Sequence, residues 1–337
     1  MFRSLAFTSL AGLLLIAAIR PADTYDLVPR FTAGMQLETP GTLTFLGDLD
    51  EVTAEMGGND ILGGTVGANI EAAMSWSESD EILETKDGEI VKLRRTYTEL
   101  AWSVQAEAEA GGESESFDET GEEDDLVGRV VEITVDEDGE MTVVDVSEGD
   151  LEALDSEKLD SLGSVSPFRT FLPTEPIEEG ESWDAKGAFA EIAEELRKGA
   201  NADGDIETFE TLLSFLEEYG SAQATGTLVG VEDEMAEISW EITVSLEIPD
   251  VLSVARQFGL GDELNEMPPS AAASMYLEME IEGSGIFDLE HHQLTKMEME
   301  GELSFSAEGS IDEDQVSIDA EASASGTYQL KTGVNVL

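Results

Sequence analysis

The sequence predicts a mainly β protein of the α+β class, with one long curved antiparallel sheet, or half-barrel, and a few covering helices. Three observations support this prediction. From Tyr25 onward, apolar and polar residues alternate with the period of two that is typical of strands. Several alternating segments are longer than the roughly five or six residues usual for a strand. Two shorter segments instead repeat apolar residues with the spacing of an amphipathic helix.

The clearest predicted strand is AEISWEITVSLEI, residues 236–248, in which every second side chain is apolar and those between are acidic or hydroxylated. Similar segments predict further strands at 68–76, 89–110, 129–135, 141–146, 222–231, 275–282, 297–305 and 316–330. Strands with one polar and one apolar face are typical of an antiparallel sheet with one solvated side. Because a sheet this large twists and curls, we expect its apolar face to be concave.

The last predicted strand has small residues on its apolar side, namely Ala320, Ala322 and Ala324, so we expect close packing there. Helices are expected to supply the cover. A helical insertion is predicted at about 186–219, in two stretches whose apolar residues fall at i, i+3, i+4 and i+7. These residues are Phe189, Ile192, Ala193 and Leu196, then Phe209, Leu212, Leu213 and Leu216. Shorter helices are predicted at 150–162 and 250–259.

Three connections have distinct compositions. The segment AGGESESFDETGEEDD, residues 110–125, is acidic and rich in Gly and Ser, and we interpret it as a mobile loop joining two strands. The sequence DEDGE at 136–140 predicts a hairpin turn. The segment 259–270 ends in two prolines and is expected to be irregular.

The charge is strongly one-sided. The chain of 337 residues carries 16 Lys and Arg against 76 Asp and Glu, a formal net charge of −60, yet 41% of its residues are hydrophobic, which argues against a disordered chain. Binding to nucleic acid or to anionic membrane surfaces depends on Lys and Arg, so neither is an expected partner. The acidity is consistent with a salty habitat, with bound cations or with high solubility, and the sequence does not decide among them.

The N-terminus predicts export. Residues 1–22 have Arg3 followed by an apolar run from Leu5 to Ile19, the form of a signal peptide cleaved near residues 18–22. The run is shorter than the roughly 20 residues that span a bilayer, although an uncleaved N-terminal anchor is the alternative. We therefore expect a periplasmic or extracellular protein in which residues 23–337 form a single β-rich domain. The chain has no cysteine, which excludes both disulfides and a lipid-modified N-terminal Cys.

No catalytic motif stands out. The only two histidines, His291 and His292, lie between two alternating segments, where a hairpin connection is expected, so we interpret them as turn residues rather than metal ligands. The sequence contains no Gly-x-Ser-x-Gly elbow and no phosphate-binding glycine loop. We therefore expect no enzymatic activity. Paired carboxylates are abundant, and a carboxylate-based hydrolase is a remaining alternative.

One segment partly matches a calcium-binding loop. In GANADGDIETFE, residues 199–210, Gly204 and the candidate ligands occupy positions of the calcium loop that joins two helices. The candidate ligands are Asn201, Asp203, Asp205 and Glu210. Gly199 stands at the first position, where a ligating Asp is usual. The alternative is a helix stop followed by a polar turn. Calcium is the one cofactor considered, and no other is predicted.

Two phrases resemble a group of uncharacterised exported bacterial proteins. One phrase has Leu172, Pro173, Pro176, Ile177, Gly180, Ser182 and Trp183, and the other has Gly283, Gly285, Phe287, Asp288 and Leu289. The resemblance covers roughly the C-terminal half, and it implies an exported, β-rich protein without assigning a site. Independently of it, Gly180 suits a turn before a strand and Trp183 suits a core anchor.

The function hypothesis follows from the expected concave face. We expect a non-enzymatic envelope or secreted protein that holds a lipid or other apolar small molecule there, by architectural analogy with half-barrel periplasmic carriers. The residues expected to face the ligand are Trp240, Ile242, Met275, Met279, Met297, Met299 and Phe305. The alternative is a structural or interaction module whose helices fill the concavity, with calcium as a further stabiliser. The sequence does not indicate an oligomeric state.

Overall fold

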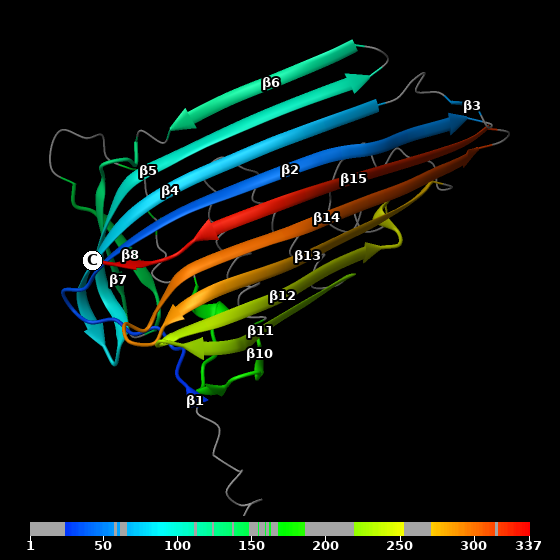
Figure 1. The fold of residues 1–337 in the computed structure, drawn as a ribbon. Coiled ribbons are helices and arrows are strands. Elements are labelled where there is room, and N and C mark those ends of the chain that lie inside the picture. The colour runs from blue at the N-terminus through cyan, green and yellow to red at the C-terminus, as the bar shows by residue number, and fades with distance from the viewer. Residues whose placement is uncertain are drawn as a thin grey trace, which may run out of the picture.

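The computed structural model describes residues 24–56, 59–60, 66–110, 113–122, 125–136, 138–147, 154, 159, 162, 168–185, 219–252, 271–313 and 316–337. Strands dominate these residues, and most belong to one antiparallel sheet of 14 strands that does not close into a barrel (Figure 1). The predicted fold class, a mainly β protein built on a long antiparallel sheet, is confirmed.

The main path of the sheet runs in the order β10, β11, β12, β13, β14, β15, β2, β4, β5, β7, β8. The bounds are β10 Ser182–Asp184, β11 Gly220–Glu232, β12 Met235–Ile248, β13 Ala272–Asp288, β14 Gln293–Glu313, β15 Val316–Thr332, β2 Gln36–Met56, β4 Val66–Lys86, β5 Glu89–Ala110, β7 Val130–Val135 and β8 Met141–Asp145. Beside this path, β6 (Glu113–Glu122) pairs with β5, while β3 (Asn59–Asp60) and β16 (Asn335–Val336) pair with β2. A second small sheet joins β1 (Thr24–Tyr25) to β9 (Ile177–Glu178), and a 3₁₀ helix, η1, spans Arg169–Phe171.

All the predicted strands are present, and the hairpin turn at 136–140 is confirmed between β7 and β8. The expectation of a loop at 110–125 was wrong. Residues 113–122 form β6, which pairs with β5 from Ala110 opposite Glu113 to Ala101 opposite Glu122. The backbone hydrogen bonds and the cross-strand neighbours provided by β5 override the low strand propensity of this acidic segment. The long strand β2 was not predicted, because Pro40, Gly41 and Gly47 interrupt its alternation.

Other predictions fall outside the described residues. These are the signal peptide at 1–22, the helical insertion up to residue 218, most of the helix predicted at 150–162, and the loop at 259–270. Of the helix predicted at 250–259, only the first residues are described, and Val251 and Leu252 are helical.

The register keeps two chemically different faces apart. In an antiparallel ladder, residues directly opposite each other point to the same face, so each rung can be followed from strand to strand. One rung is Trp240, Gly283, Met299, Leu330, Leu43, Met74 and Trp102, from β12 to β5. The next rung, on the other side, is Glu241, Glu282, Glu300, Gln329, Thr44, Ala73 and Ser103. We call the side of the first rung the apolar face and the side of the second the acidic face.

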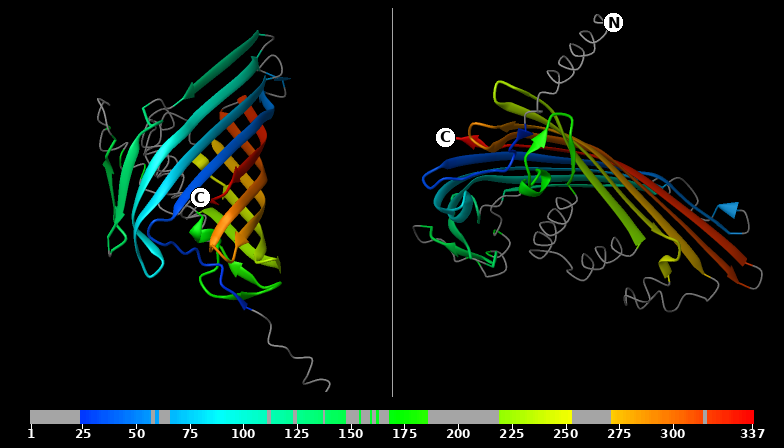
Figure 2. Two further views of the ribbon diagram at one scale, coloured as in Figure 1. Left: turned by 60° about the vertical axis from the view of Figure 1, so that its left-hand side comes forward. Right: turned by 90° about the horizontal axis from the view of Figure 1, so that it is seen from below.

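The apolar face is the inner side of the arch. Figure 2 shows the sheet curving so that η1 and the β7–β8 hairpin lie on the same side of it. Phe171 of η1 packs edge-on against Trp240 of β12, with ring centroids 6.2 Å apart. The backbone carbonyl of Phe171 accepts hydrogen bonds from the indole nitrogens of both Trp183 (3.1 Å) and Trp240 (2.9 Å). A single carbonyl oxygen has two lone pairs, so it satisfies both indole donors and holds η1 against the sheet.

All four tryptophans of the chain lie across from a glycine on a neighbouring strand. The pairs are Trp76 with Gly41, Trp102 with Gly121, Trp183 with Gly226, and Trp240 with Gly283. Gly285 also lies under Trp240, and a Cβ there would come within 2.5 Å of the indole ring and 3.0 Å of the Lys296 carbonyl oxygen. The large rings therefore lie flat over strands that present no side chain of their own, which is a recognised way to stabilise glycine within a sheet.

Gly285→Ala tests this packing. The added methyl group meets both the indole and a backbone carbonyl, and overpacking of this kind typically costs about 1–3 kcal/mol. The free energy of unfolding in urea should fall by that amount. The matched control is Gly230→Ala in β11, where a Cβ would have no heavy atom within 4 Å. If the two variants have equal stability, the packing of Trp240 on β13 does not require glycine at position 285.

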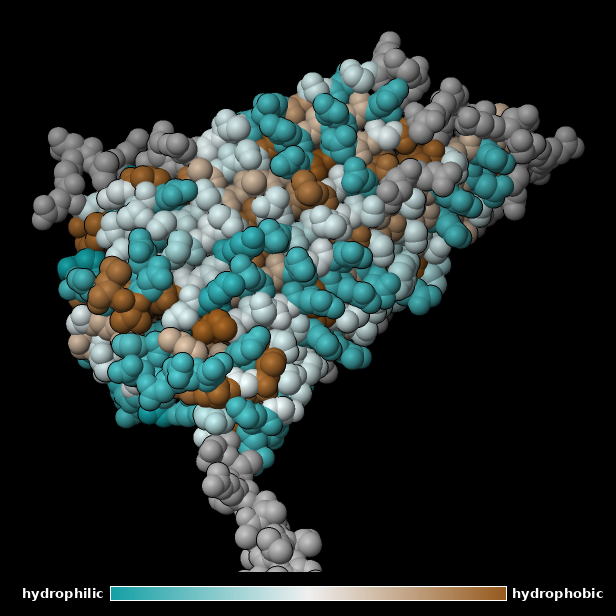
Figure 3. Space-filling model, in the orientation of Figure 1, coloured by the Kyte–Doolittle hydropathy of each residue, from teal (hydrophilic) through white to brown (hydrophobic). Residues whose placement is uncertain are grey.

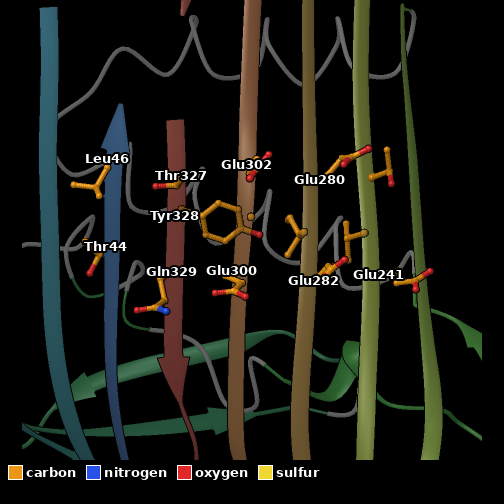
Figure 4. A pocket seen from close by; sticks show the side chains of 14 residues that line it. Thr44, Leu46, Glu241, Glu280, Glu282, Glu300, Glu302, Thr327, Tyr328 and Gln329 are labelled. Carbon is orange, nitrogen blue, oxygen red and sulfur yellow. The ribbon is translucent and has the colours of Figure 1, made fainter. Parts of the chain in front are cut away.

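The acidic face carries like charges directly opposite one another. Glu282 lies opposite both Glu241 and Glu300, and Glu280 lies opposite Glu302. Figure 3 shows groups of hydrophilic residues on this face with some hydrophobic residues between them, and Figure 4 shows these glutamates around a pocket. The volume of this pocket is about 800 Å³. Like charges directly opposite on a sheet are destabilising, and salt screens the repulsion between exposed groups.

Glu282→Gln should therefore raise the Tm at low salt, because it removes the carboxylate shared by two repulsive pairs. The gain should shrink at high salt, where the Debye length falls to roughly 3 Å at 1 M. The control is Glu237→Gln, on the same face but opposite Ile286. Differential scanning calorimetry at the two salt concentrations measures the effect, and an equal gain at both would contradict an electrostatic origin.

Candidate functional site

The apolar face has a closed part and an open part. The closed part is the core around Trp240, where Leu27, Phe171 and Phe287 are almost fully buried. The open part lies farther across the sheet and farther along the long strands, and it retains exposed apolar side chains, with Ile70 at 40%, Met74 at 39% and Phe117 at 52% exposure. Exposed apolar side chains gathered on one face are a usual mark of a binding surface.

All seven residues predicted to face an apolar ligand lie on the apolar face, but they divide between its two parts. Trp240, Ile242, Met297 and Met299 are buried in the closed core, at 4% exposure or less. Met275, Met279 and Phe305 are only partly buried. Only the second group therefore lies where a ligand could reach without disrupting the core.

A groove crosses the open part at right angles to the strands. Its two neighbouring rungs are Leu303, Gly326, Gly47, Ile70, Ala106 and Phe117, and then Phe305, Ala324, Leu49, Ala68, Ala108 and Glu115. Glycine and alanine make the floor, and larger apolar side chains rise around them. The volume of this open depression is about 640 Å³. We call this space the apolar groove.

Sequence reasoning found only part of this groove. The small residues of β15 signalled close packing, and Ala324 is indeed in the floor. Gly47 and Leu49 were missed because β2 was not predicted, and Phe117 was missed because its segment was interpreted as a loop. The alanines of β5, Ala106 and Ala108, were recognised as strand residues, but nothing in the sequence showed which strand lay beside them.

A buried ion cluster lies on the same face near β7. The guanidinium of Arg95 donates two hydrogen bonds to Asp80, from Nε and Nη2, each 2.8 Å long. Its Nε also lies 3.2 Å from a carboxylate oxygen of Glu78. The side chains of Arg95 and Asp80 are 5% and 8% exposed. These groups line a cavity of only about 40 Å³, which has room for water but not for a substrate.

Glu78 has an unusual proton affinity in this cluster. Burial raises its pKa from the ordinary value of 4.5 to about 7, against the opposing attraction of Arg95 and together with repulsion from Asp80. Below pH 4.5, Glu78 is protonated in both the folded and the unfolded chain. Between pH 4.5 and about 7, the unfolded chain releases this proton while the folded chain retains it. The contribution of Glu78 to the free energy of unfolding therefore falls as the pH rises through that window.

Glu78→Gln should remove this pH dependence. The variant and the native chain should have similar stability near pH 4, and the variant should be more stable at pH 8 by roughly 3 kcal/mol, at about 1.36 kcal/mol for each pKa unit. Urea unfolding at both pH values measures the difference. The control is Glu81→Gln, which alters an exposed partner of Arg94 and should leave the pH dependence unchanged. A Glu78→Gln variant less stable than the native chain at pH 8 would contradict the raised pKa.

The two histidines form a turn, as the sequence predicted. They lie in the connection 289–292 between β13 and β14, where His292 has a φ of 54°. Asp288 holds this turn, because its carboxylate accepts hydrogen bonds from the backbone nitrogens of Glu290 and His291 and lies 2.7 Å from Nδ1 of His291. This contact raises the pKa of His291. The imidazole of His291 is therefore bound within the hairpin by Asp288, and the ring of His292 packs edge-on against Phe287.

Within the described ranges, no group of His, Asp and Glu side chains is placed to hold a metal ion. The predicted calcium ligands Asn201, Asp203, Asp205 and Glu210 lie outside those ranges, so the calcium hypothesis stays a prediction. None of the helices in the described part of the chain has the length and apolarity needed to cross a membrane.

The segments 172–183 and 283–289, which the sequence analysis singled out, meet in the fold. Leu172 and Ile177 from the first and Phe287 from the second belong to the same core. Gly180 has a φ of +80°, consistent with its predicted place in a turn before β10. Both segments therefore help build the closed part of the apolar face.

Comparison with known proteins gives only distant likenesses. No protein-family model and no curated protein matches the chain. Among solved structures, a lipovitellin described for its lipid–protein interactions aligns with 90% of this chain and 26% of its own, at 9% identity and a TM-score of 0.34. OccK7 of Pseudomonas aeruginosa aligns over 91% of this chain and 100% of its own, at 6% identity and a TM-score of 0.21. At such values these likenesses carry no functional argument.

Proposed function

We propose that this chain is an exported, non-enzymatic envelope or secreted protein that holds a lipid or other apolar small molecule in the apolar groove. The observation that carries the proposal is the groove itself, two adjacent rungs with a floor of glycine and alanine on an apolar face. Its volume of about 640 Å³ lies within the roughly 300–1,000 Å³ of typical ligand pockets, which are mostly apolar.

The architecture of the sheet indicates that the walls of the apolar groove are rigid. The closed core around Trp240 and Phe171 fixes one end of the long strands, and the ladders that leave it continue unbroken into the groove. A ligand therefore meets a preformed surface, which lowers the entropic cost of binding. Export is supported by the signal peptide predicted at residues 1–22 and by the resemblance to exported bacterial proteins.

The principal alternative is a structural or interaction module in which the chain fills its own concave face. The closed part favours this alternative, because Trp240, Met297 and Met299 show that the face can be fully packed. A carboxylate-based hydrolase is less favoured, since Glu78, the one carboxylate of the described residues whose pKa is raised to about 7, lines a cavity of only about 40 Å³.

Ala108→Trp tests whether the groove binds a ligand. The indole would occupy the floor, and an overpacked site typically loses about 1–3 kcal/mol, so affinity for a neutral pyrene-labelled monoacylglycerol should fall roughly fivefold or more. The matched control is Ala101→Trp, the same substitution on the same strand but on the acidic face.

Fluorescence titration of the delipidated protein measures both variants against the native chain. Binding weakened only by Ala108→Trp supports the proposal. If the native chain does not bind the probe, or if both variants bind it as tightly as the native chain, the face is filled and the structural alternative stands.

A further inference from the structure

The described residues that line the groove include no basic side chain. In the described residues, all Lys and Arg lie near the opposite ends of the strands or in the segments packed there. They are Arg30, Lys86, Lys92, Arg94, Arg95, Arg129, Arg169, Lys296 and Lys331. The strand segments that line the groove carry only carboxylates as charged groups. A ligand in the groove therefore experiences a negative potential that no neighbouring described cation offsets.

Two carboxylates lie at one end of the groove on the apolar face itself. In β6, Glu115, Phe117 and Glu119 lie opposite Ala108, Ala106 and Val104, which fixes all three on this face. Both glutamates are exposed, and no ion pair joins either to another described residue. Among the described strands β6 pairs with β5 alone, so Glu115 lies at the outer rim of the groove, and Glu119 lies beside that rim, on the next rung beyond Phe117.

Phe117 lies between the two carboxylates. Residues two apart on a strand are separated by about 7 Å, so the half-exposed ring and the two carboxylates fit within the reach of one head group. An aromatic face attracts a cation through its quadrupole, and quaternary ammonium groups are recognised in this way. Carboxylates beside the ring add direct charge attraction.

The groove has room for a chain that ends at this rim. From Leu303 of β14 to Phe117 of β6 it crosses five gaps between strands, or about 24 Å at roughly 4.8 Å for each gap. An extended acyl or alkyl chain can therefore lie across the strands, over the glycine and alanine floor, with its head group at β6.

We infer that the apolar groove selects an amphiphile with a cationic head group, an amine or a quaternary ammonium, held at Glu115, Phe117 and Glu119. This inference rests on the proposed function and adds the class of ligand to it. Anionic amphiphiles such as fatty acids are disfavoured at the same place, because the head group would meet two unpaired carboxylates.

The test uses three amphiphiles with the same dodecyl tail: the trimethylammonium salt, the neutral maltoside and the sulfate. Each is titrated calorimetrically into the full, delipidated chain below its micellar concentration. Circular dichroism is recorded alongside, so that unfolding is not counted as binding. The expected order of affinity is cationic, then neutral, then anionic, and added salt should reduce the difference.

The double variant Glu115→Gln/Glu119→Gln separates local recognition from the general attraction of a chain with net charge −60. It should weaken binding of the cationic amphiphile by about two- to fivefold, the effect expected for exposed ion pairs, and leave the maltoside unchanged. The control is Asp118→Asn on the same strand, because Asp118 lies opposite Gln105 on the acidic face. This control should bind all three amphiphiles like the native chain.

The outcomes distinguish the two claims. If the maltoside binds in the groove and the cationic amphiphile binds no more tightly, the head-group inference is wrong while the proposed function stands. The inference also fails if Asp118→Asn weakens cationic binding as much as the double variant does. If Ala108→Trp weakens the binding of none of the three, the proposed function itself is wrong.

Discussion

The register of the large sheet is the constraint on which the rest of the structure depends. Side chains alternate between the faces, so a slip of one residue between any two strands would exchange the apolar and acidic faces on one side of the slip. The bulge opposite Ser323 and Ala324 preserves this separation, because Leu49 lies opposite Ala324 on one side of it and Val52 lies opposite Ala322 on the other. This register produces one apolar surface that is continuous over many strands. Both the core around Trp240 and the apolar groove belong to that surface.

The same face serves two purposes because its rungs differ in side-chain size. Around Trp240 large side chains meet large side chains from η1 and the N-terminal segment, and the contact with the Phe171 carbonyl satisfies two indole donors at once. Farther along the strands, glycine and alanine replace them, and a space remains. On the opposite face, carboxylates lie across from carboxylates at a cost in stability. That cost is consistent with a protein that must stay soluble while part of its apolar face is exposed.

The fold could be predicted from the sequence where the signal is local. Residues 236–248 alternate without interruption, and the structure makes them β12. The amino-acid composition was misleading at the acidic strand β6, because it predicted a loop where pairing with β5 produces a strand. Contacts between distant strands were beyond sequence reasoning. Nothing in the neighbourhood of Gly41 reveals that Trp76 will lie over it, and the proximity of Arg95 to Glu78 depends on the bulge between Ser77 and Glu78.

The candidate site shows the same limit. The methionines lie on the apolar face as predicted, yet Met297 and Met299 are buried in the closed core and Met279 is only partly buried beside it, a difference that the alternation in the sequence does not show. The central claim, that the groove holds a ligand rather than serving as packing space, is tested most directly by native mass spectrometry of the protein purified from its own host. The account predicts an additional mass that dissociates as an apolar small molecule. If gentle ionisation gives only the mass of the polypeptide without a bound molecule, the result would contradict the account.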